Sequence, residues 1–274
     1  MADEWRRYLA QQIELGGAEI FLETRHTLQE ESPGERRRAP APAPTSATVA
    51  AAGEQLKTNE EPKWRKGAPP IPGPGLRVET PPATLLGNEL SNLVTLEEVA
   101  EKIRGTHCCG LCRDRMNAVP GEGNPNARLM LVGEGPGATE DATGRPFVGQ
   151  AGKLLDDILQ AIEVPRETVY ITNIVKCRPP QNRKPLPDEI AACIPYLHRQ
   201  IDLIRPKVLL ALGGTAGEAM LGVRKSLGEL RMKVHTFNDI PLVVTYHPAA
   251  LLRNPNWKKP TWDDVRIVRQ LLDR

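Results

Sequence analysis

The chain has 274 residues, which is enough for one sizeable folded domain and a further segment. Its 36 lysines and arginines are nearly balanced by 34 aspartates and glutamates, so the overall charge does not indicate a nucleic-acid-binding protein. The sequence contains no apolar run of about 18 residues and no secretory leader, so we expect neither a membrane span nor secretion, and a cytoplasmic protein is predicted.

The charge is distributed unevenly along the chain. Residues 171–274 contain 17 basic side chains against 9 acidic ones, so the C-terminal part can present a basic face to a polyanion. An ordinary solvated surface is the alternative, and charge alone does not distinguish the two.

Composition divides the chain into three parts. Residues 1–31 are predicted to form an N-terminal helical segment of unknown role, because Trp5–Phe21 has helical character. Residues 32–90 are rich in Pro, Ala, Gly and charge, a composition that buries too little apolar surface to offset the entropy of ordering, so we expect a disordered linker. Residues 91–274 are predicted to be the folded domain, and the N-terminal extension is a candidate contact for another protein.

A short helix is predicted after Thr95, because Thr95 and Glu98 form a capping-box pattern ahead of an apolar face that ends at Gly105. Three cysteines follow this helix. Cys109 and Cys112 have the two-residue separation of metal ligands, which lets one tight turn point both sulfurs at one centre.

The chain contains two further cysteines. Cys177 follows a predicted strand, and Cys193 lies in the predicted helix Pro187–Ile204. Four thiolates from two distant segments suit either a zinc ion or an iron–sulfur cluster. Buried thiols without a metal are the alternative.

The stretch 129–152 is the centre of the predicted fold. An apolar strand, Leu129–Val132, runs into a loop rich in Gly and Pro and then into a helix, which is where α/β proteins bind ligands. Gly133 and Gly135 permit close backbone approach to a ligand. A purely structural turn is one alternative, and a nucleotide-phosphate loop is another, although no Lys-Ser/Thr pair follows.

The alternation of strands and helices then repeats. Strands are predicted at residues 169–173, 207–212 and 240–245, so the fold class is α/β, with three layers and a central, mostly parallel sheet of four strands. Glu134, Asn173 and His247 each follow a predicted strand, and the carboxyl ends of parallel strands meet at one edge. The sequence therefore predicts a shared pocket there.

Four motifs in order carry a resemblance to a known family. The motifs are GEGPG at 133–137, GRPFVGQAG at 144–152, VYITNIVKCRPP at 169–180 and HPAALLRNP at 247–255. Together they resemble the motifs of the family 4 uracil-DNA glycosylases, the thermostable bacterial and archaeal type that carries a [4Fe–4S] cluster. The resemblance implies a monomeric repair enzyme of the bacterial cytosol or nucleoid. Such an enzyme flips uracil out of single- or double-stranded DNA and hydrolyses its N-glycosidic bond, leaving an abasic site.

The resemblance also implies roles for the pocket residues. Phe147 would stack on the flipped uracil, and Asn173 would read its edge, donating to O4 and accepting from N3–H. His247 would donate to O2 as negative charge develops there. Gly133 and Gly135 would lie against the base. The alternatives are an ordinary core aromatic for Phe147, a turn cap for Asn173 and a structural histidine.

Three acidic residues follow the first motif glycine. In the better-known glycosylase families a carboxylate two residues after that glycine activates water, but Gly135 stands at that position here. Glu134 is therefore the first candidate for this role and Asp141 the second. By the same resemblance, Glu140 would exclude the methyl group of thymine.

The last motif implies contacts with DNA. Leu251 and Leu252 are candidates for a wedge that fills the gap left by the flipped base, and Arg253 for a phosphate contact. Core leucines are the alternative. Four basic residues are candidates for tracking the DNA backbone: Lys176, Arg178, Arg183 and Lys184.

The metal ligands depart from the family pattern. The family register places its second cysteine at Cys109 and its first at Thr106, which cannot supply a thiolate. We expect the ligands of a [4Fe–4S] cluster, with zinc as the less favoured occupant, to be Cys109, Cys112, Cys177 and Cys193. Cys108 is left open as a substitute, and the expected role of the metal group is structural.

Two other classes of function remain open at this stage. A non-catalytic or differently specific nucleic-acid-binding module of the same fold would bind uracil-containing DNA without releasing the base. A nucleotide-binding protein would use residues 133–137 for phosphates and would be indifferent to substitution of Phe147 or Asn173.

Overall fold

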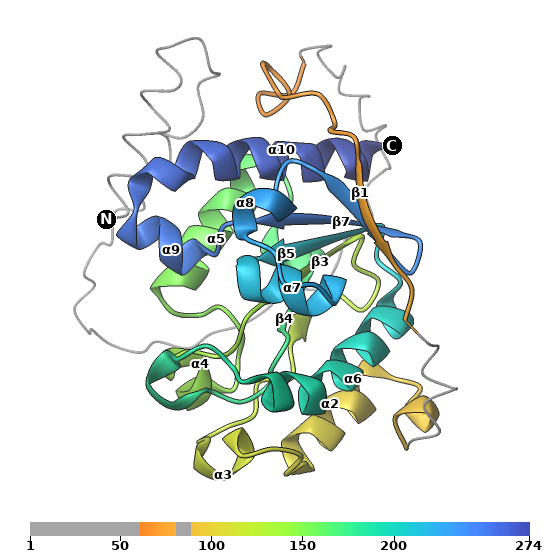
Figure 1. The fold of residues 1–274 in the computed structure, drawn as a ribbon, viewed down its shortest axis with the longest axis vertical. Helices are drawn as coiled ribbons and strands as arrows, with labels where there is room; N and C mark the ends of the chain where they lie inside the picture. The colour runs from red at the N-terminus through yellow and green to blue at the C-terminus, as the bar shows by residue number, and fades with distance from the viewer. Residues whose placement is uncertain (1–60, 81–88) are drawn as a thin grey trace, which may run out of the picture.

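Seven strands form one sheet at the centre of the molecule (Figure 1). The computed structural model describes residues 61–80 and 89–274. The sheet order is β1-β6-β7-β5-β3-β4-β2. The strands are β1 (Pro74–Val78), β2 (Glu122–Gly123), β3 (Leu129–Gly133), β4 (Tyr170–Asn173), β5 (Val208–Leu212), β6 (Val234–Phe237) and β7 (Ile240–Thr245).

The four middle strands, β7, β5, β3 and β4, are mutually parallel. They are the four strands that the sequence predicts, so the predicted parallel α/β core is confirmed. The predicted count of four is wrong, because three further strands complete the edges. Both edges contain an antiparallel pair, β6 with β7 and β2 with β4.

Helices cover both faces of the sheet. The apolar side chains of β3 alternate between the faces, so that Leu131 packs with α5 and α10 while Met130 packs with α6 and α7. This alternation produces the predicted three layers. The helices are α2 (Leu96–Gly105), α3 (Leu111–Asp114), α4 (Ala138–Thr143), α5 (Gln150–Ala161), α6 (Pro187–Ile204), α7 (Gly214–Leu221), α8 (Leu227–Leu230), α9 (Pro248–Arg253) and α10 (Lys258–Asp273).

Short 3-10 turns join several of these elements. They are η2 (Glu89–Asn92), η3 (Arg166–Thr168), η4 (Pro180–Asn182) and η5 (Pro255–Trp257). The predicted capping box of α2 is present, with the Thr95 hydroxyl accepting from the Glu98 N–H. Figure 1 shows α2 beside α6, and the two helices pack through Val99, Ile103 and Tyr196.

The predicted disordered linker at 32–90 is wrong for residues 61–80. β1 pairs in parallel with β6, and the indole of Trp64 is completely buried against α10, where the Arg269 guanidinium lies 4.9 Å from the ring centre. This segment is ordered by tertiary contacts that its Pro- and Gly-rich composition does not reveal. The predicted helical segment 1–31 lies outside the described residues.

In the described part of the chain, no helix combines the length and the hydropathy needed to cross a membrane.

Candidate active site

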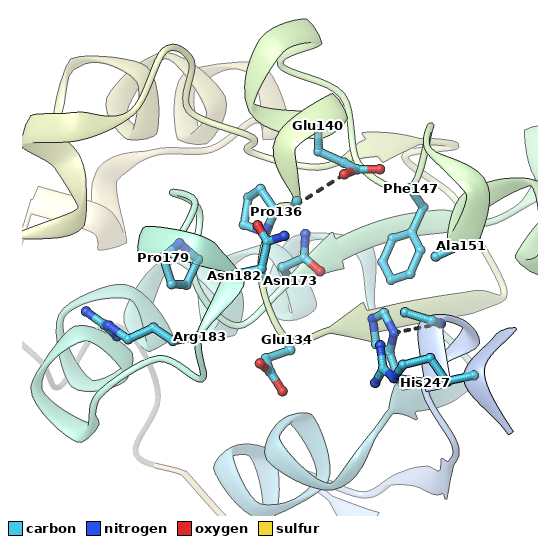
Figure 2. Close-up of a pocket in the computed structure, with 14 residues that line it drawn as sticks. Glu134, Pro136, Glu140, Phe147, Ala151, Asn173, Pro179, Asn182, Arg183 and His247 are labelled. Carbon is cyan, nitrogen blue, oxygen red and sulfur yellow. Dashed lines mark hydrogen bonds between the residues drawn. The ribbon is translucent and has the colours of Figure 1, made fainter. Parts of the chain in front are cut away.

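A cavity of about 310 Å³ opens at the carboxyl ends of β3, β4 and β7 (Figure 2). Its volume falls in the range of small-molecule sites. The three residues predicted to converge there, Glu134, Asn173 and His247, all line it, so the prediction of a shared pocket is confirmed. The full lining is Glu134, Gly135, Pro136, Gly137, Glu140, Phe147, Ala151, Asn173, Pro179, Asn182, Arg183, His247, Ala249 and Arg253.

Phe147 forms one wall of the cavity. Its backbone has a φ of 51°, a conformation that bulky residues seldom adopt, and Arg166 fixes it by donating to the carbonyls of Pro146 and Phe147 at 2.7 and 3.1 Å. A Cβ at Gly152 would lie only 1.9 Å from the Phe147 carbonyl oxygen, so glycine is required there. The Phe147 ring centre is 5.4 Å from that of His247, and the two rings border the same space.

Asn173 ends β4 and points into the cavity (Figure 2). Its carboxamide oxygen, Oδ1, is buried without a hydrogen-bond partner among the described residues. Such an orphaned acceptor is costly unless a ligand satisfies it. A Cβ at Gly133, on the adjacent strand, would lie 2.3 Å from this oxygen, which is the close approach that the first motif glycine permits.

His247 lies at the N-cap of α9. Its Nδ1 accepts from the Ala249 N–H at 3.2 Å, so the ring hydrogen is on Nε2. Burial lowers the pKa of His247 to about 4, with Arg253 adding to the shift and Glu140 opposing it. The ring is therefore a neutral donor near pH 7.

The three acidic candidates occupy different surroundings. Glu134 lines the cavity, and its carboxylate makes no hydrogen bond to another described residue. Glu140 lines it as well, but its carboxylate accepts the backbone N–H groups of Gly137, Val148 and Gly149 and so fixes the glycine-rich loop (Figure 2).

Asp141 lies outside the cavity lining. Its buried carboxylate accepts the N–H of Met116 at 3.0 Å and thereby holds the segment before β2. The structure thus corrects the second candidate for water activation and leaves Glu134 as the carboxylate open to the pocket.

Sequence reasoning misses the contribution of η4 to the pocket. Pro179, Asn182 and Arg183 form the wall opposite Phe147. The Arg183 guanidinium pairs with the Glu189 carboxylate at 2.7 and 2.8 Å. The signal available in the sequence is the RPP run after Cys177, which favours a turn at the end of a strand.

The predicted DNA-contacting residues are divided between core and surface. Leu251 is completely buried in the core between the sheet, α5 and α10, so its predicted role as a wedge is wrong. Leu252 is partly exposed, and Arg253 is exposed at the cavity rim. Lys176 is also buried, at 1% exposure, and cannot track a DNA backbone.

All five cysteines come together beside the loop that follows β4. The sulfurs of Cys108, Cys109 and Cys112 lie within 4.8 Å of one another, and Cys112 Sγ is 3.7 Å from Cys177 Sγ. Cys193 lies near this group, since burial and the neighbouring thiols of Cys108 and Cys109 raise the pKa of Cys193. The predicted ligands are thus adjacent, with Cys108 as a fifth thiol.

Thr106 takes no part in this group. Its hydroxyl accepts from the Tyr196 O–H at 3.1 Å, which satisfies it away from the sulfurs. The thiols that this segment contributes to the group are those of Cys108, Cys109 and Cys112.

The thiols respond differently to their surroundings. Burial raises the pKa of Cys109 to about 11 and that of Cys177 to about 12. Burial would also raise the pKa of Cys112, but the Cys109 N–H, neighbouring thiols and Arg115 lower it below its ordinary value. Arg115 also donates to Cys177 Sγ at 3.1 Å. A group of soft sulfur ligands at one point could hold a metal.

Comparison with known proteins identifies a family model that matches this chain and several proteins that are similar to it. The family model of the uracil DNA glycosylase superfamily matches residues 120–270. A type-4 uracil-DNA glycosylase of Sulfurisphaera tokodaii is 46% identical over 186 residues, which cover 65% of this chain and 84% of that protein.

Two further type-4 uracil-DNA glycosylases show the same level of similarity. The protein of Saccharolobus solfataricus is 46% identical over 65% of this chain and 86% of its own length. The protein of Thermotoga maritima is 46% identical over 58% of this chain and 84% of its own length.

Proposed function

Because the chain belongs to the uracil DNA glycosylase superfamily, we propose that it excises uracil from DNA as a base-excision-repair enzyme. The reaction is hydrolysis of the N-glycosidic bond of deoxyuridine, which releases uracil and leaves an abasic site. The target nucleotide must leave the base stack to reach the cavity.

The buried Oδ1 of Asn173 is the observation that carries this proposal. It lacks a partner among the described residues, and uracil N3–H is a donor of the right kind to satisfy it. The amide NH2 of Asn173 then donates to uracil O4. Cytosine has an unprotonated N3 and an amino group at C4, so both hydrogen bonds fail, and a site of this type rejects the wrong base by about 10⁴-fold or more.

His247 stabilises the departing base. Its Nε2–H is available because Ala249 occupies Nδ1, and it donates to uracil O2, where negative charge grows as the bond breaks. The neutral ring costs less to bury than an imidazolium. Donors of this kind are typically worth about 10²- to 10³-fold in rate.

The carboxylates and Phe147 complete the pocket. Glu134, whose carboxylate makes no hydrogen bond to another described residue, orients the attacking water or offsets positive charge on the sugar. The ring of Phe147 stacks on the flipped base. Glu140 holds the loop that carries Phe147, and Gly133 and Gly135 let the base approach the backbone. We assign the exclusion of the thymine methyl group to Glu140, as the resemblance implies.

The cysteine group suits a [4Fe–4S] cluster, with zinc as the less favoured occupant. The ligands are Cys109, Cys112, Cys177 and Cys193, and Cys108 is a substitute. A bound cluster supplies structural cross-linking between these segments rather than electron transfer. The residues themselves fix the α2–β2 segment to the loop after β4, which forms the pocket wall.

DNA contacts extend from the pocket rim. Arg253 on α9 lines the cavity and is assigned a phosphate contact. Leu252, the partly exposed residue before it on α9, is assigned the wedge. The substrate is uracil-containing single- or double-stranded DNA, and the enzyme acts as a monomer in the bacterial cytosol or nucleoid. Residues 1–31 are a candidate contact for another protein.

The test is cleavage at uracil. Oligonucleotides with one uracil, single-stranded or paired, are treated with anaerobically purified protein and then alkali, and strand scission is read on a denaturing gel. We expect scission by the wild type and a loss of about 10²-fold or more in Asn173→Ala and His247→Ala. Asn126→Ala is the matched control, because Asn126 is exposed and lies outside the cavity lining.

Binding of uracil-containing DNA without scission, in protein that keeps its metal, would refute the enzymatic proposal. That outcome would instead support the non-catalytic module. Scission that is equally strong in Asn173→Ala would refute the assignment of the pocket.

A further inference from the structure

Lys176 is buried directly behind the pocket, and the proposed reaction does not use it. Its Nζ atom donates three hydrogen bonds, to Thr172 Oγ1 at 2.6 Å, to the Asn173 carbonyl at 2.8 Å and to Gln200 Oε1 at 2.8 Å. An ammonium group has three donors, so these acceptors satisfy it completely.

The acceptors of Lys176 belong to a larger buried network. The Thr172 hydroxyl donates to the Pro120 carbonyl at 2.9 Å, and the Gln200 amide donates to the same carbonyl at 2.8 Å. Lys176 also accepts the Val119 N–H through its own carbonyl, at 2.8 Å. The network therefore joins β4, α6 and the segment that precedes β2.

These three segments also carry the cysteines. Cys177 follows Lys176 directly, Cys193 lies on α6 with Gln200, and Cys112 begins the stretch that leads to Val119 and Pro120. One residue thus contacts each segment of the cysteine group and also the backbone of the residue that reads uracil.

No carboxylate in the described segments forms a salt bridge with Lys176. The three hydrogen bonds to the oxygens of Thr172, Asn173 and Gln200 are therefore what holds the Lys176 amine in place.

We infer that Lys176 is a positioning residue that fixes the Asn173 backbone and braces it against the metal-holding segments. The inference rests on the proposed function for its catalytic part. Loss of the amine frees the Asn173 carbonyl and removes one hydrogen bond each from Thr172 Oγ1 and Gln200 Oε1. The carboxamide of Asn173 then loses its alignment, although the residues that touch uracil are unchanged.

The test compares Lys176→Met with Lys207→Met. Both replace a lysine with an apolar side chain of similar length, and Lys207 donates to the Leu272 carbonyl at 3.1 Å, at the opposite end of the parallel strands. We expect Lys176→Met to lower kcat on uracil-containing DNA by about 10- to 100-fold while KM changes by less than about threefold. Lys207→Met should retain the wild-type kcat within about twofold.

A second readout follows the metal. The rate of iron release to a chelator is measured by visible absorbance under anaerobic conditions. This rate should be at least about fivefold higher in Lys176→Met than in the wild type. Lys207→Met should release it at the wild-type rate. This readout does not depend on glycosylase activity. If the wild type releases no uracil, the proposed function fails, while metal release still tests the bracing role.

Wild-type kcat and wild-type metal release in a folded Lys176→Met protein would overturn the inference. Circular dichroism establishes whether that variant folds. If it does not, Thr172→Val decides, because it removes one acceptor and keeps the lysine. A lower kcat with unchanged KM in Thr172→Val supports the inference, and an unchanged kcat overturns it.

Discussion

A Cβ atom at Gly133 would lie 2.3 Å from Oδ1 of Asn173, and it would also lie 2.7 Å from the edge of the Phe147 ring. Gly133→Ala must therefore displace Asn173, Phe147 or both. We predict that Gly133→Ala lowers the single-turnover rate of uracil release by about 10²-fold. Quenched-flow or gel kinetics at saturating protein measure this rate.

Gly228→Ala is the control for this substitution. Gly228 lies in α8, where a Cβ atom would have nothing within 4 Å, and alanine is the better helix former. Its rate should equal that of the wild type. A wild-type rate in Gly133→Ala would show that the pocket tolerates movement of Asn173.

The lowered pKa of His247 predicts how stability depends on pH. Burial lowers this pKa from 6.5 to about 4, so the unfolded state binds the proton more readily than the folded state. The contribution is fully present above pH 6.5 and is lost as the pH falls toward 4. Between pH 7.5 and 5, the wild type should lose about 2 kcal/mol more unfolding free energy than His247→Gln.

Urea unfolding of both proteins at the two pH values checks this difference. The other two histidines with a lowered pKa, His198 and His235, are present in both proteins and cancel in the comparison. Equal losses would mean that His247 titrates normally. The rate of uracil release should stay level from pH 8 to pH 6, because the ring remains neutral throughout.

Two adjacent leucines on α9 should have opposite effects. Leu251 is completely buried, so Leu251→Ala should lower the unfolding free energy by about 2–5 kcal/mol. Leu252 is partly exposed and precedes Arg253, so Leu252→Ala should cost less than about 1 kcal/mol but weaken binding to uracil-containing DNA. Urea unfolding and fluorescence anisotropy separate the two effects. Weaker DNA binding by Leu251→Ala at unchanged stability would contradict this assignment.

Trp64 tests whether the segment before β1 stabilises the domain. Its ring is completely buried, and Trp64→Ala should lower the unfolding free energy by about 3–5 kcal/mol. Trp257 is 37% exposed and stacks on Tyr246 at 4.9 Å, so Trp257→Ala should cost only about 1 kcal/mol. Similar, small losses in thermal or urea unfolding would show that residues 61–80 are only loosely attached.

The predictable part of the fold is the part with continuous apolar runs. β3, β4, β5 and β7 are recognisable because strands buried on both faces carry such runs. β1 has the sequence PGLRV, which gives no such signal, and its order comes from β6. A strand whose order depends on a distant partner is not recognisable from its own residues.

The predictable part of the site is the set of polar residues at strand ends. The sequence places Asn173 and His247 correctly in the pocket because parallel strands end at one edge. It wrongly predicts that Lys176 faces DNA, since lysine is usually exposed, and the three buried acceptors come from contacts the sequence does not show. It also wrongly offers Asp141 as a candidate for activating water, because the orientation of the short helix α4 turns Glu140 and not Asp141 toward the cavity.

The parallel pairing of β1 with β6 has a consequence for synthesis of the chain on the ribosome. Residues 61–80 emerge early, whereas β6 at Val234–Phe237 emerges only after most of the sheet has been made. β1 must therefore wait for its partner, and its docking is a late, long-range event of folding. Until β1 docks, β6 exposes an unpaired strand edge. A segment that is synthesised early therefore covers an edge that forms late.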